Sequence, residues 1–219
     1  MNMGKEIWNL LRKDLMLELR MGYALSGILL YVFSTVFIVF ASFIQLPNTV
    51  WNILFWVVLL FASVNAIVKS FVQESGNRQL YYYSLVNPVS VLLAKMAYNV
   101  GLLFLISLLI WAGLAFVGGN PVRDPELFLL AMFLGSSGFA ITFTFVSAIS
   151  AKADHNSTLL AIMSFPLVIP ILMTLVKLSA NALGLMNDTG LQKDIILLCA
   201  MDGLLLGAAL ILFPFLWTD

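Results

Sequence analysis

Charged residues are scarce in this chain. Only 10% of its 219 residues are Asp, Glu, Lys or Arg, the eleven basic side chains balance the eleven acidic ones, and 62% of the residues are hydrophobic. A soluble domain has about 25% charged residues, and a nucleic-acid-binding protein presents a basic face. The composition therefore excludes an ordinary soluble domain, a disordered chain and a nucleic-acid partner.

Cysteine and histidine are limited to Cys199 and His155. A lone cysteine forms no internal disulfide, and no Cys/His cluster favours a structural metal site. His155 lies in the short polar segment 151–157, where a solvated side chain is a better interpretation than a haem or metal ligand. A GxxxxGK[ST] motif is also absent, so the chain has no P-loop for ATP. We expect no directly bound cofactor or metal and no enzymatic activity.

Long hydrophobic segments dominate what remains. A membrane-spanning helix needs roughly 20 apolar residues, and lipid requires the backbone to satisfy its hydrogen bonds internally, which selects helices. The first segment is too long for a cleaved signal peptide. We predict an all-α integral membrane protein, a single transmembrane domain over residues 1–219, with six spans near 22–44, 50–72, 91–117, 127–150, 158–178 and 194–217.

The basic residues near the span ends predict the orientation, because cytoplasmic loops carry an excess of Lys and Arg. With the N-terminus inside, three basic residues lie outside: Arg123, Lys177 and Lys193. The other eight lie inside: Lys5, Arg12, Lys13, Arg20, Lys69, Arg78, Lys95 and Lys152. We therefore expect both termini to be cytoplasmic.

Residues 3–20 predict an amphipathic helix in the cytoplasmic headgroup layer. On a helical wheel, one face gathers Lys5, Asn9, Arg12, Lys13 and Arg20, and the apolar arc holds Ile7, Trp8, Leu10, Leu11, Leu15, Leu17 and Leu19. Asp14 and Glu18 fall inside the apolar arc, where contact with acyl chains would be costly. Either this arc packs on protein, where Lys or Arg meets the two acids, or the wheel is distorted and both acids reach water.

The longest cytoplasmic break, residues 73–90, has a size and polarity that suit docking of a partner. Glu74 and Arg78 are spaced i, i+4 on one face of a short interfacial helix, and Pro88 ends the segment. Tyr81, Tyr82 and Tyr83 fit the headgroup level. The alternative is a plain solvated connector.

Three features lie within the predicted spans. Pro166 and Pro170 each remove a backbone hydrogen bond, so we expect a bent or unwound helix that lines a route or fits the packing. Asp202 is an intramembrane carboxylate, for which Lys177 is the candidate partner, either in a buried pair that locks two helices or in a proton relay. Small residues at 135–138 (GSSG) favour close helix packing.

Several motifs in order resemble the CcmB family, haem exporter protein B of cytochrome c maturation. They are Lys13-Asp14-Leu15, Glu18-Leu19-Arg20, Gln73-Glu74, Asn87-Pro88-Val89-Ser90, Leu92-Leu93-Ala94-Lys95, Gly135-Ser136-Ser137-Gly138 and Pro166-Leu167-Val168-Ile169-Pro170. The resemblance implies a permease subunit with the six-helix fold of type-2 ABC exporters in a bacterial inner membrane. It also implies four partners: a CcmA-like ATPase that binds ATP, a CcmC-like haem protein, a small CcmD-like subunit and the haem chaperone CcmE.

Under this resemblance, residues 73–90 become the coupling loop to the ATPase, and Asp14 and Glu18 belong to the same cytoplasmic platform. Other functions remain open. A type-2 ABC permease could export a lipid, polysaccharide or drug. A secondary transporter would need inverted repeats and paired broken helices, and only one candidate break is present. A membrane scaffold without transport is the third alternative.

Overall fold

The computed structural model describes residues 3–21, 23–42, 46–72, 87–152, 157–186 and 190–218. Of residues 17–21, 23–25, 40, 68–72, 151–152, 157–161 and 216–218 only the backbone is described. The described chain forms helices α1 (Met3–Met21), α2 (Tyr23–Ser42), α3 (Asn48–Val72), α5 (Pro88–Gly118), α6 (Pro125–Lys152), α7 (Ser157–Ala182) and α8 (Leu191–Thr218).

Five of these helices are long and apolar enough to cross a membrane: Asn48–Ile67, Pro88–Gly118, Pro125–Ser150, Ile162–Ala182 and Leu191–Phe215. They match the predicted second to sixth spans to within a few residues at most ends. The described apolar part of α2, Ser26–Val39, is shorter. A sixth span therefore stays a prediction.

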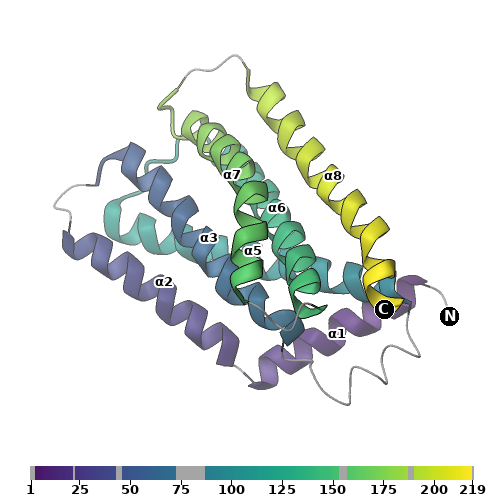
Figure 1. Cartoon of the computed structure of the whole chain (residues 1–219). Coiled ribbons are helices and arrows are strands. Elements are labelled where there is room, and N and C mark those ends of the chain that lie inside the picture. The colour runs from purple at the N-terminus through teal and green to yellow at the C-terminus, as the bar shows by residue number, and fades with distance from the viewer. Residues whose placement is uncertain are drawn as a thin grey trace.

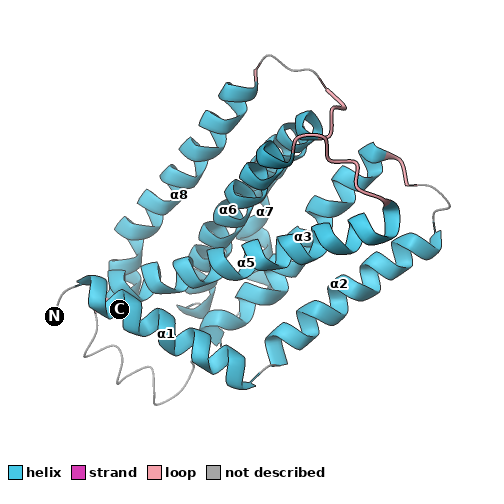
Figure 2. Ribbon diagram, turned by 180° about the vertical axis from the view of Figure 1, so that it is seen from behind, coloured by secondary structure: helices cyan, strands magenta, loops and turns pink. Residues whose placement is uncertain are grey.

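Helix α6 is the centre of the bundle. It packs on α3, α5, α7 and α8, and 78% of its apolar span is buried, compared with 22% for α8. Figures 1 and 2 show the other helices arranged around it, with α8 at one side. The hydrophobic period of 3.6 residues cannot identify such a helix, because one that is buried all round is apolar on every face.

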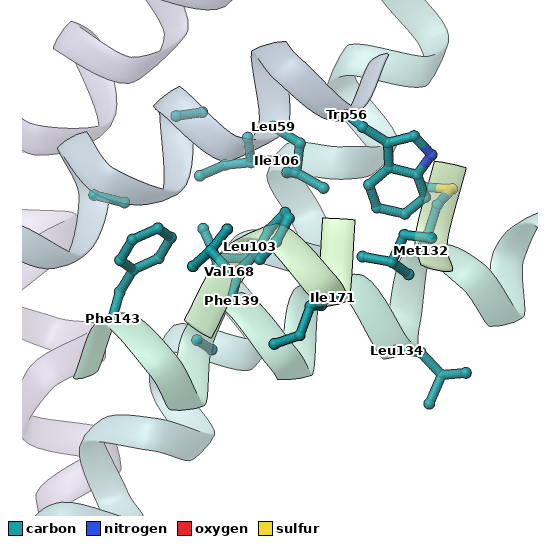
Figure 3. Packing of buried hydrophobic residues seen from close by; sticks show 14 of the residues in the cluster. Trp56, Leu59, Leu103, Ile106, Met132, Leu134, Phe139, Phe143, Val168 and Ile171 are labelled. Carbon is teal, nitrogen blue, oxygen red and sulfur yellow. The ribbon is translucent and has the colours of Figure 1, made fainter. Parts of the chain in front are cut away.

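The core between α3, α5, α6 and α7 is built from large apolar side chains (Figure 3). Trp56, Phe139 and Ile106 are at most 1% exposed. The small residues at 135–138 let neighbouring helices pack closely against α6. A Cβ on Gly135 would lie 2.5 Å from Trp56 Cζ3, so α6 needs glycine at that position to admit the indole ring.

The two ends of the bundle differ. At one end, α5 finishes, α6 begins and α7 finishes (Figure 1). The backbone N–H groups of Arg123 and Asp124 both donate to Ala182 O, at 3.0 and 2.9 Å. Gly184 terminates α7 with φ +69°, and the side chain of Arg123 covers it so closely that a Cβ would meet Arg123 Cδ at 2.7 Å. At the opposite end, α1 lies across the bundle where α5 begins and α8 finishes.

Candidate functional site

The predicted coupling loop lies mostly outside the described residues, including Glu74, Arg78, Tyr81, Tyr82 and Tyr83. Its last part is described. Asn87 caps α5, because its Oδ1 accepts a hydrogen bond from Val89 N at 3.0 Å, and Pro88 occupies the first turn. Proline is well suited there, since the first N–H groups of a helix have no intrahelical partner. Helix α5 therefore begins three residues before the predicted span, directly at the loop.

Helix α1 contacts the first turn of α5. Ser90 Oγ, which is fully buried, donates to Glu6 Oε2 at 3.1 Å, and α1 packs along α5. Lys13 Nζ lies 3.3 Å from Asp14 Oδ1, and the Asp14 side chain is only 14% exposed. The side chain of Glu18 lies outside the described part. Asp14 thus meets a lysine on a mostly covered side of α1.

The expected pair of Lys177 and Asp202 is wrong. Lys177 Nζ lies 3.3 and 3.2 Å from the two carboxylate oxygens of Asp194. Asp194 is in the first turn of α8, close to the end of α7, where Lys177 lies. Asp202 is eight residues further along α8, about 12 Å at 1.5 Å per residue. Lys177 therefore pairs with Asp194, the acid that lies closer to it.

Asp202 instead joins α8 to α6. Ser137 Oγ lies 2.8 Å from Asp202 Oδ2 and donates either to it or to Leu134 O. Asp202 Oδ1 faces Gly138, where a Cβ would approach it to 2.7 Å, and it has no hydrogen-bond partner. The residue Asp202 is 8% exposed. Gly138 therefore admits a buried acid, as Gly135 admits an indole ring.

A polar contact between α3 and α7 was missed by the sequence analysis. Trp56 Nε1 donates to Ser179 Oγ at 2.7 Å, and Ser179 Oγ lies 2.7 Å from Asn52 Oδ1. Asn52 Nδ2 donates to Val176 O at 2.9 Å. The available signal was Asn52 and Trp56, spaced i, i+4 in an otherwise apolar span. Their one-turn spacing places both on the same face of α3.

A second missed contact joins α5 and α6. Asn99 Nδ2 donates to Thr144 Oγ1 at 2.8 Å, and both side chains are almost completely buried. Lys95, one turn before Asn99, is 5% exposed. A lysine at the end of a predicted span is expected to reach water, so its burial was not predictable from its position.

The two prolines do not break their helix. Helix α7 is continuous from Ser157 to Ala182 with Pro166 and Pro170 inside it. Pro166 is exposed and Pro170 half-buried, whereas the inward side of α7 carries Val168, Ile171, Leu175 and Leu178. The prolines are one turn apart and roughly opposite to this packed side. The predicted unwinding of the helix is therefore wrong, whereas a bend that fits the packing stays a prediction.

The described residues contain no group of three or more His, Cys, Asp or Glu side chains able to hold a metal ion. His155 lies outside the described residues. Several polar side chains of the described bundle connect helices in pairs: α1 with α5, α3 with α7, α5 with α6, and α8 with both α6 and α7. These contacts hold and orient helices.

The comparison with protein families gives a match over nearly the entire chain. A model of the CcmB protein family matches residues 5–218. The chain belongs to the CcmB family. CcmB proteins are membrane permease subunits of the haem-export ABC system of cytochrome c biogenesis, so this chain is a multi-pass inner-membrane protein that acts with partner subunits and is not itself the catalyst. A comparison with curated proteins gave no match.

Proposed function

We propose that this CcmB protein couples ATP hydrolysis in a CcmA-like ATPase to haem handling and to release of the haem-loaded CcmE-like chaperone. In this proposal, residues 73–90 dock on the ATPase, with charged contacts from Glu74 and Arg78. Tyr81, Tyr82 and Tyr83 brace the loop at the membrane surface. A CcmC-like haem protein and a CcmD-like subunit complete the complex, and both termini are cytoplasmic.

The continuity from the loop into α5 carries the proposal. Asn87 and Pro88 start α5 directly at the end of the loop, and Ser90 joins it to α1 through Glu6. Helix α5 packs on α1, α2, α3, α6 and α8. A displacement of the loop by the ATPase would therefore reach most of the bundle through one helix. We expect closure of the ATPase dimer to tilt α2, α3 and α7, which requires two states with different contacts.

Charge reversal tests this coupling. Glu74→Arg and Arg78→Glu are each expected to reduce co-purification of the CcmA-like ATPase and maturation of c-type cytochromes. The double reversal restores the sum of charges and controls for net charge. Lys193→Glu is the matched control, because Lys193 is exposed at the opposite end of the bundle, and it should leave ATPase co-purification unchanged. Normal co-purification and normal cytochrome maturation in both single variants would reject the docking role of the loop.

A further inference from the structure

The charges of α1 are divided between two sides of the helix. Among its described side chains, the exposed ones are Met3, Lys5, Trp8, Asn9, Arg12, Leu15 and Met16. The only charged members of this set are Lys5 and Arg12. Both described acids, Glu6 and Asp14, are half-buried and engaged, by Ser90 and by Lys13. The exposed side therefore carries two positive charges and no described negative one.

Basic and apolar residues share this exposed side, which corrects the helical wheel. Ile7, Leu10 and Leu11 are half-buried, but Trp8 is 65% and Leu15 47% exposed. At 3.6 residues per turn, Lys5, Trp8, Arg12 and Leu15 fall within an arc of about 80°. They form a mixed surface about three turns long, which we call the α1 outer face and define by these four residues. The apolar arc predicted from the sequence is thus split between the bundle and the outside.

We propose that the α1 outer face binds anionic phospholipid headgroups at the surface of the bilayer. Trp side chains favour the headgroup level of a membrane, and the apolar stems of Lys and Arg let their charged ends reach the phosphates. Lys5 and Arg12 are seven residues apart, about 10 Å along the helix, so each can meet a separate headgroup. The position of α1 across the end of the bundle, rather than along it, matches this use (Figure 2).

The occupant is a lipid rather than a soluble acid because the face combines charge with exposed Trp8 and Leu15. A soluble anion would satisfy Lys5 and Arg12 but leave these two apolar side chains in water. An interfacial helix buries such groups about 5–10 Å into the boundary of headgroups and acyl chains. This inference does not depend on the coupling role of residues 73–90.

Fluorescence quenching by brominated lipids tests the proposal on the full-length chain in vesicles. Brominated phosphatidylglycerol or brominated phosphatidylcholine is mixed at equal mole fraction into unlabelled phosphatidylcholine. The signal of Trp8 is obtained by subtracting the Trp8→Phe variant. Wild type is expected to show stronger quenching by the anionic lipid, and added salt should weaken this preference because it screens exposed charges.

The anionic preference is the ratio of Trp8 quenching by brominated phosphatidylglycerol to that by brominated phosphatidylcholine. The variant Lys5→Gln/Arg12→Gln should reduce this ratio by at least about fivefold, the factor expected for each basic residue near an anionic surface. Lys5→Arg/Arg12→Lys retains both charges and should retain the preference, which separates charge loss from misfolding. Lys193→Gln, at the other end, should also retain it. An unchanged preference in the Gln variant would overturn the proposal. So would the absence of Trp8 quenching by either lipid, the result expected if protein covers this face.

Discussion

Gly135→Ala should destabilise the bundle, because α3 and α6 approach each other over this glycine. The added Cβ would lie 2.5 Å from Trp56 Cζ3, 2.9 Å from Trp56 Cη2 and 3.1 Å from Leu175 Cδ1. Carbon atoms prefer about 3.5–4.0 Å, so the indole must move by about 1 Å. It is completely buried, packed edge-on to Phe55 at 5.0 Å and hydrogen-bonded to Ser179. The ring therefore has little room to yield.

The expected cost follows from these contacts. Overpacking costs about 1–3 kcal/mol, and loss of the indole hydrogen bond would add about 1 kcal/mol. Alanine recovers up to about 1 kcal/mol of helix propensity. The net loss is about 2 kcal/mol, which for a chain of this size lowers Tm by about 4–8 °C.

Thermal unfolding of the purified chain in detergent, followed by far-UV circular dichroism, measures this loss. Gly101→Ala is the matched control, because nothing lies within 4 Å of its Cβ position in α5, and its Tm should not fall. In a Trp56→Phe background, which removes the clashing ring atoms, Gly135→Ala should cost at least about 1 kcal/mol less. Equal Tm values for Gly135→Ala and wild type would refute the reasoning, as would an equal loss in both backgrounds.

Three further substitutions test other contacts in the same unfolding assay. Ser179→Ala leaves Trp56 Nε1 without its acceptor and should cost about 1–3 kcal/mol, whereas Ser179→Thr, which keeps the hydroxyl, should cost less. Lys177→Met leaves the mostly buried Asp194 unpaired and should cost about 1–2 kcal/mol, a modest loss because the lysine is partly exposed and solvent weakens the pair. Adding Asp194→Leu should recover stability, and no recovery would contradict the pairing. Asn87→Ala removes the cap of α5 and should cost about 1 kcal/mol, while Asn87→Asp should cost little; equal losses in the two would argue against capping.

The extent of the helices was largely predictable from the sequence. The predicted spans 50–72 and 127–150 differ from α3 and α6 by at most two residues at each end, because charges and prolines lie near these boundaries. Polar partners were less predictable. Asp202 was recognised as an intramembrane acid. Its neighbour depends on which residue of α6 faces it, which follows from the rotation of both helices.

Proline gives a second example of this limit. Pro166 and Pro170 necessarily remove backbone hydrogen bonds, yet α7 continues through both. Whether a helix unwinds depends on the packing that surrounds it. Here the inward side with Ile171 and Leu175 is tightly packed, which holds the helix while the prolines lie on the other side.

The sequence by itself determined that this is a helical membrane protein, because hydrophobic length depends only on the order of residues. The positions of its charges predict that the cytoplasmic end is basic and polar. Its order of motifs also indicated the CcmB family, which the match over residues 5–218 confirms. Only the tertiary structure decided that Trp8 and Leu15 are exposed rather than packed on the bundle, that Lys177 meets Asp194, and that Gly135 and Gly138 admit Trp56 and Asp202. These facts depend on the rotation and spacing of neighbouring helices, which are set by side-chain packing between segments far apart in the chain.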